Sequence, residues 1–205
     1  MKNVFIVLDG LDGAGKGEMI ERLHNYLFKK SKSFRILTTR EPTSGKYGQE
    51  IRTLLKEDKD PKSDPEKYLK LFTLDRKEHL EKTVLPFLSQ TDGSTHIVLC
   101  DRYYYSTIAF QHTQGVPEKT VLEANRNFLK PTIAFILDLS AEQSLKRISQ
   151  RGETEKFEQL EFMKDLRKNF LRLKQILPDN LIVIDASRSI QEVFSDIKKE
   201  IDSYL

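Results

Sequence analysis

Hydrophobic residues along the chain gather in short continuous runs separated by longer segments with helical spacing. Continuous apolar runs are typical of strands that are covered on both faces. Between them, apolar residues recur every three or four positions, as in helices that pack one face against a sheet. The pattern predicts an α/β fold, a three-layer sandwich with a five-stranded parallel sheet and helices on both faces. The predicted strands begin at Val4 ("VFIVLD"), Phe34 ("FRILTT"), His96 ("HIVLCD"), Thr132 ("TIAFILDL") and Leu181 ("LIVID").

Helical periodicity marks the segments between these strands. One predicted helix contains Met19, Ile20, Leu23 and Leu27, and a long one spans residues 65–88. Further helices are predicted near residues 118–129, 141–149, 159–176 and 190–204. The polar stretch "KEDKDPKSDPEK" predicts a solvated loop, and the charged, glycine-containing segment at about 147–157 is typical of a lid over a phosphate site. We interpret residues 1–205 as one domain.

Composition restricts the function without choosing it. Hydrophobic residues make up 38% and charged residues 32% of the chain, which is too apolar for a disordered protein. The net charge of +3 is small, so charge does not indicate a nucleic-acid surface. The single cysteine, Cys100, lies in an apolar run and is predicted to be a buried core residue in a reducing compartment. Since no run resembles a signal peptide or a membrane span, we expect a cytoplasmic protein.

The first predicted strand runs into the glycine-rich stretch "GLDGAGK", and a predicted helix follows. Gly10, Gly15 and Lys16 have the spacing of a phosphate-binding loop, in which backbone N–H groups and the helix N-terminus face phosphate oxygens. Lys16 is placed to reach the β- and γ-phosphates of a nucleoside triphosphate. The predicted ATP-binding residues of the loop are Gly10, Leu11, Asp12, Gly13, Ala14, Gly15, Lys16, Gly17 and Glu18.

Gly17 stands where most such loops carry a serine or threonine that binds Mg²⁺ directly. Two interpretations follow. Either water and carboxylates elsewhere hold the magnesium ion, which keeps several waters in most protein sites, or the loop binds nucleotide but transfers phosphate poorly.

Two further motifs follow predicted strands. "TREP" (residues 39–42) follows the second strand and "DRYYYS" (101–106) follows the third. In an open parallel sheet the carboxyl ends of the strands form the ligand crevice, so both motifs are expected to face the glycine loop. Phe72 and Arg76 are four residues apart and share one face of the long helix, where a ring and a guanidinium can hold a base.

Together, "GLDGAGK", "TREP", "LFxxxR" and "DRYxxSxxAFQ" make the chain resemble the thymidylate kinase family between Val4 and Gln111. The resemblance implies ATP-dependent phosphorylation of dTMP to dTDP, with Mg²⁺ as cofactor and a homodimeric assembly. It implies that Asp12 contacts the sugar or organises the transferring phosphate, that Arg102 binds the acceptor phosphate and that Asp101 contacts magnesium through water. The dTMP-binding residues that it implies are Asp12, Arg40, Glu41, Pro42, Phe72, Arg76, Arg102, Tyr103, Ser106, Thr107 and Gln111.

The predicted lid supplies further basic residues. Some members of the family carry an arginine directly after the loop aspartate, where this chain has Gly13. Arg147 and Arg151 are four residues apart in the lid segment, and a positioned arginine stabilises the charge of a transferring phosphoryl group. We predict that Arg147 binds ATP phosphates and that Arg151 is catalytic together with Asp12, Lys16 and Arg102.

Several features leave alternatives open. Tyr104 and Tyr105 are bulky for this family, and they either narrow the sugar pocket in favour of 2′-deoxyribose or pack beneath the helix. The histidines show no spacing typical of a zinc site or a nucleophile triad. The alternative functions are a kinase for another nucleotide or deoxynucleoside, a polyphosphate-dependent kinase, and a catalytically weakened nucleotide-binding homologue.

Overall fold

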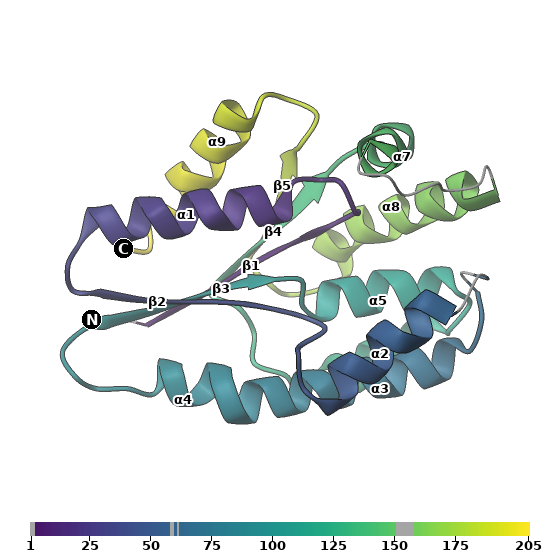
Figure 1. The fold of residues 1–205 in the computed structure, drawn as a ribbon, viewed down its shortest axis with the longest axis horizontal. Helices are drawn as coiled ribbons and strands as arrows, with labels where there is room; N and C mark the ends of the chain where they lie inside the picture. The colour runs from purple at the N-terminus through teal and green to yellow at the C-terminus, as the bar shows by residue number, and fades with distance from the viewer. Residues whose placement is uncertain (1–2, 58–59, 61, 151–157) are drawn as a thin grey trace.

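A computed structural model describes residues 3–57, 60, 62–150 and 158–205. Its centre is a sheet of five parallel strands in the order β2-β3-β1-β4-β5 (Figure 1). All five predicted strands are confirmed. The strands are β1 (Val4–Gly10), β2 (Phe34–Arg40), β3 (Thr95–Asp101), β4 (Ile133–Asp138) and β5 (Leu181–Asp185).

Helices cover both faces of the sheet, which confirms the three-layer prediction. α1 (Lys16–Lys30) and α9 (Ile190–Asp202) lie on one face (Figure 1). The opposite layer contains α2 (Lys46–Glu57), α3 (Pro65–His79), α4 (Leu85–Leu88), α5 (Tyr104–Thr113) and α8 (Glu158–Ile176), with α6 (Glu118–Asn125) beside α5. α7 (Ala141–Ser149) follows β4.

The alternation of side chains along β1 explains the two cores. Ile6 and Leu8 belong to the cluster under α1 and α9, whereas Phe5 and Val7 belong to the cluster under α5 and α8. Because every residue of β1 is buried, the strand reads as one apolar run instead of an alternating pattern. The buried Cys100 on β3 agrees with its predicted core position.

Some helices differ from the prediction. The segment 65–88 is not one α-helix, because a π-helical turn, η1 (Leu80–Val84), separates α3 from α4. The helix predicted over residues 118–129 ends at Asn125. α2 and α5 were not predicted, and α2 extends to Glu57 inside the segment expected to be a loop. No helix in the described part of the chain is long and apolar enough to cross a membrane.

Candidate active site

The loop between β1 and α1 has a backbone conformation that favours glycine at three positions. Gly10, Gly13 and Gly15 have φ values of 131°, 75° and 92°, a region that favours glycine. A Cβ at Gly10 would also lie 2.5 Å from the carbonyl oxygen of Leu137 on β4. Gly15 has no side chain to cap α1, so the first-turn N–H groups of this helix are available to an anion.

Lys16 is the buried cation of this loop. Its side chain is only 6% exposed, and its Nζ donates hydrogen bonds to the carbonyl oxygens of Gly10 (3.1 Å) and Leu11 (2.9 Å). Burial and the nearby charge of Arg102 lower the pKa of Lys16 to about 8, although Asp12, Asp101 and Asp9 oppose the shift. Lys16 is therefore a weaker base than a free lysine, and a bound anion would raise its pKa again.

Asp9, at the end of β1, joins the loop to the start of α5. The buried carboxylate accepts hydrogen bonds from the backbone N–H groups of Gly10 (2.8 Å), Tyr103 (3.1 Å) and Ser106 (2.9 Å), and from the Ser106 hydroxyl (2.6 Å). Burial raises the pKa of Asp9, while Arg102, Ser106 and Lys16 oppose the rise. Asp9 thus sets the distance between the glycine loop and the "DRY" segment, and the sequence analysis did not identify it.

Arg102 brings the "DRY" segment against the glycine loop. Its Nη2 donates to Asp12 Oδ1 at 2.6 Å, and its Nη1 donates to the Gly10 carbonyl at 3.3 Å and to the Ser106 hydroxyl at 2.8 Å. Its backbone is left-handed, with a φ of 68°, which turns the side chain toward the loop. Burial lowers the pKa of Arg102, but the carboxylates of Asp12, Asp9 and Asp101 raise it above its usual value. The predicted meeting of Asp12, Lys16 and Arg102 is present.

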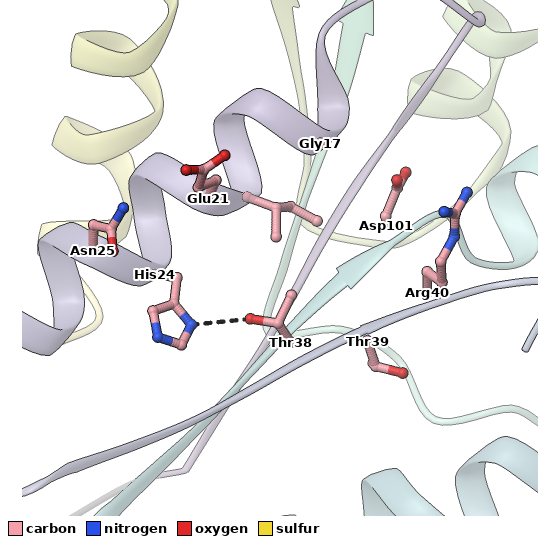
Figure 2. A pocket seen from close by; sticks show the side chains of 9 residues that line it. Gly17, Glu21, His24, Asn25, Thr38, Thr39, Arg40 and Asp101 are labelled. Carbon is pink, nitrogen blue, oxygen red and sulfur yellow. Dashed lines mark hydrogen bonds between the residues drawn. The ribbon is translucent and has the colours of Figure 1, made fainter.

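A pocket of about 470 Å³ opens beside this cluster, between α1 and β2 (Figure 2). Figure 2 shows Gly17, Asp101 and Arg40 at one end of the pocket and His24 and Asn25 at the other. The Oδ1 atom of Asp101 is buried and has no hydrogen-bond partner among the described residues. An unpaired carboxylate oxygen of a residue that lines this pocket together with Gly17 is a ligand that a cation or an ordered water can use.

α7 holds the glycine loop from the other side. The Ser144 hydroxyl donates to the carbonyl oxygen of Asp12 at 2.5 Å. Arg147 Nη1 donates to the Gly13 carbonyl and its Nη2 to the Ala186 carbonyl, both at 3.2 Å. Arg147 therefore contacts the loop and links it to the segment after β5, and its binding of ATP phosphates stays a prediction. Arg151 and residues 152–157 of the predicted lid lie outside the described residues.

A buried ion pair joins α3 to the segment that follows β2. Arg76 is 1% exposed, and its Nε donates to Glu41 Oε2 at 2.9 Å. Its Nη1 donates to Asn125 Oδ1 (2.7 Å) and its Nη2 to the Thr107 hydroxyl (2.9 Å). The rings of Tyr103 and Phe128 lie 5.2 and 5.4 Å from this guanidinium. The structure thus joins "TREP", "LFxxxR" and "DRYxxSxxAFQ" through one arginine.

The other predicted dTMP-binding residues lie around this pair. Phe72 is partly buried on α3, and Gln111 is buried on α5 with its Oε1 unpaired among the described residues. Arg40 ends β2 and lines the pocket of Figure 2, and the Glu41–Pro42 peptide bond is cis. Asn125 and His79 also contribute, because they bond Arg76 and Glu41 of the predicted motifs, although neither belongs to a motif itself.

Tyr104 and Tyr105 pack inside the protein. Both side chains are buried, and both hydroxyls donate to Asp179 before β5, at 2.9 Å for Tyr105. Burial, together with Asp179, raises the pKa of Tyr104 and Tyr105 above the usual value. Of the two interpretations, packing beneath the helix is correct.

Comparison with known proteins identifies the family. The family model described as "Thymidylate kinase" matches residues 8–197. A "Probable thymidylate kinase" of Pyrococcus horikoshii is 34% identical over 201 residues, which cover 96% of this chain and 95% of the relative. Proteins with the same printed name from Methanosarcina barkeri and Archaeoglobus fulgidus are 35% and 32% identical, covering 100% and 98% of this chain and 98% and 96% of the relatives. The chain belongs to the thymidylate kinase family.

Proposed function

We propose that this chain transfers the γ-phosphate of ATP to dTMP and releases ADP and dTDP. The observation that carries the proposal is the position of Arg102, which contacts Asp12 and Gly10 of the glycine loop from the opposite wall of the crevice. An acceptor phosphate bound to this guanidinium lies beside the donor loop. A phosphate oxygen of dTMP then attacks the γ-phosphorus, and the bond to the β-phosphate oxygen breaks.

The residues act by positioning and charge. Lys16 and the N-terminus of α1 hold the donor phosphates, and Arg102 holds the acceptor phosphate. The acceptor phosphate is itself the nucleophile, so no strong general base is required. Asp12 is 73% exposed and therefore gives up its ion pair with Arg102 at low cost when the phosphate arrives. Thymine stacks on Phe72 and accepts a hydrogen bond from Arg76.

Magnesium fits the pocket beside Gly17. The unpaired Oδ1 of Asp101 supplies a buried anionic oxygen, which suits a hydrated ion that keeps most of its waters. Mg²⁺ neutralises charge on the β- and γ-phosphates of ATP when it is bound. No group of three or more histidine, cysteine or acidic side chains suited to a metal occurs among the residues that the structure describes. The proposed role of Asp101 therefore involves water rather than a closed protein site.

Gly17→Ser is expected to tighten the use of Mg²⁺. A Cβ at Gly17 meets no atom within 4 Å, so the hydroxyl fits without rearrangement. The half-saturating Mg²⁺ concentration should fall about tenfold, because one direct protein ligand is added to the metal. Gly17→Ala is the matched control, since it adds the Cβ without an oxygen. Equal Mg²⁺ dependence in the serine and alanine variants would contradict a metal site next to residue 17.

The lowered pKa of Lys16 predicts that ATP binding depends on pH. With a pKa of about 8, Lys16 of the free protein loses its proton as the pH rises through 8, and ATP must then restore it. The Kd for ATP should rise about tenfold between roughly pH 7 and pH 9, the change in the charged fraction of such a lysine. Calorimetry in two buffers of different ionisation enthalpy should detect proton uptake above pH 8. Proton release on binding would show that the assignment of Lys16 is wrong.

A coupled assay of ADP release tests the acceptor. Purified chain, ATP and Mg²⁺ are given dTMP, dUMP, dCMP, thymidine or no acceptor, and the product is identified by mass. We expect dTDP to form fastest, and thymidine to be inactive because it has no phosphate for Arg102. Preference for thymidine, use of polyphosphate in place of ATP, or ATP binding without transfer would each favour one of the alternative functions.

The remaining parts of the proposal come from the sequence patterns and, for the homodimer, from the resemblance to the family. They are one domain over residues 1–205 with a lid at about 147–157, a homodimer and a cytoplasmic location. Arg151 is proposed to stabilise the transferring phosphoryl group from that lid.

A further inference from the structure

A buried chain of polar side chains runs from β2 to Arg76. The Thr39 hydroxyl lies 2.7 Å from His79 Nε2, and His79 Nδ1 lies 3.0 Å from Glu41 Oε1. The other carboxylate oxygen of Glu41 accepts from Arg76, 2.9 Å from Nε and 2.8 Å from Nη2. His79, Glu41 and Arg76 are all less than 5% exposed. Buried polar groups of this kind are costly unless they are paired, so the chain has a defined arrangement.

The geometry of Glu41 transmits the position of His79 to Arg76. A carboxylate is planar, so a hydrogen bond that fixes Oε1 also fixes where Oε2 lies. Oε2 in turn determines the plane of the guanidinium, which also lies near the rings of Tyr103 and Phe128. Arg76 and His79 are three residues apart on α3 and therefore face the same side of this helix.

We propose that His79 is a positioning residue for recognition of the base. It holds Glu41, and through Glu41 it holds the orientation in which Arg76 meets thymine. This inference rests on the proposed function, because it assumes that Arg76 serves the acceptor side. It assigns His79 no contact with substrate and no proton transfer.

His79→Phe tests the inference. Phenylalanine keeps a ring at this buried position but removes the hydrogen bond to Glu41 Oε1. The KM for dTMP should rise about tenfold, as expected when a binding group shifts by a fraction of an ångström, with the KM for ATP within about twofold. His79→Asn should recover most of the loss, since its amide nitrogen replaces Nδ1. A lowered melting temperature with unchanged KM for dTMP would mean that His79 only supports the fold.

If His79→Phe does not fold, Thr39→Val tests the hydrogen-bonded series from its other end, at Thr39. Thr39 lies at the pocket wall in Figure 2, and its hydroxyl bonds His79. The KM for dTMP should rise by roughly threefold, a smaller effect because Glu41 keeps its direct partner. Thr38→Val is the matched control, because the next threonine bonds His24 of α1 at 3.1 Å on the opposite face of β2. Equal effects of the two valine substitutions would overturn the proposal.

A double-mutant cycle with Arg76→Lys distinguishes a failure of the role proposed for His79 from a failure of the proposed acceptor site. If His79 acts through Arg76, His79→Phe should change the KM for dTMP by less than about twofold once Arg76 is lysine. Additive effects would overturn the inference while leaving the acceptor site intact. If Arg76→Lys alone left the KM for dTMP unchanged, the proposed acceptor site itself would fail.

Discussion

Replacing Arg102 with alanine is expected to lower kcat/KM for dTMP about a thousandfold, within the range for a cation that stabilises phosphoryl transfer. The guanidinium is the only described side chain that hydrogen-bonds both Asp12 and Ser106, so no neighbour replaces it at that place. The initial rate of dTDP formation at varied dTMP measures the loss. ATP binding, measured separately, should change by less than about tenfold because Lys16 keeps its partners.

The fold should survive this substitution. Asp9 keeps its four hydrogen bonds to Gly10, Tyr103 and Ser106, and Asp12 is exposed enough to be hydrated. The matched control is Arg172→Ala, which removes an arginine paired with Glu118 at 2.8 Å on the α6–α8 side of the molecule. The control should have normal kinetics. Near-normal dTDP formation by Arg102→Ala would remove the acceptor-phosphate assignment.

Gly10→Ala is expected to be the most destabilising single substitution in the loop. Its φ of 131° is unfavourable for a residue with a Cβ, and the Cβ would lie 2.5 Å from the Leu137 carbonyl oxygen. Because both atoms belong to paired backbones of β1 and β4, neither can move without breaking the sheet register. The expected cost is about 3 kcal/mol or more in the free energy of unfolding, measured by urea denaturation.

Gly15→Ala separates the destabilisation caused by the contact with Leu137 from the destabilisation caused by backbone strain. Gly15 also has a positive φ, 92°, but a Cβ there meets no atom within 4 Å. Its cost should therefore be only the strain, about 1 kcal/mol. If the two alanine variants were equally stable, the close approach of Gly10 to β4 would not be a constraint on the loop.

The fold was largely predictable because its information is local. Each strand is a continuous apolar run, and the helices α1, α7, α8 and α9 carry an apolar stripe. α5 escaped prediction because it is buried on nearly all sides, so its apolar and polar residues follow no helical period. The π-helical turn could not be predicted either, since Leu80–Val84 has the same spacing of apolar residues as an α-helix.

The site residues that belong to a sequence motif could be predicted. Those that come together only when the chain folds could not. The glycine loop, Arg102 and Arg76 lie in recognisable patterns. Asp9 reads as one more residue of a strand, yet its carboxylate bonds groups up to 97 positions away. Asn125 and His79 carry no spacing signal, because their partners Arg76 and Glu41 are 49 and 38 positions distant.

Charge in the crevice explains why ligand binding is favoured there. Lys16 and Arg102 lie close enough that Arg102 lowers the pKa of Lys16, and the carboxylates of Asp9, Asp12 and Asp101 favour the charged form of both cations. In the proposed complex, two anionic ligands replace those contacts with stronger ones, because phosphate oxygens approach both cations at once. The proposed mechanism therefore requires that the two phosphates meet between Lys16 and Arg102.

A crystal structure with dTMP and a non-hydrolysable ATP analogue tests that claim most directly. We predict that the dTMP phosphate lies within hydrogen-bond distance of Arg102, with the γ-phosphate of the analogue at Lys16 and the thymine against Phe72 and Arg76. Finding dTMP bound away from Arg102, or with its phosphate directed away from Lys16, would contradict the account.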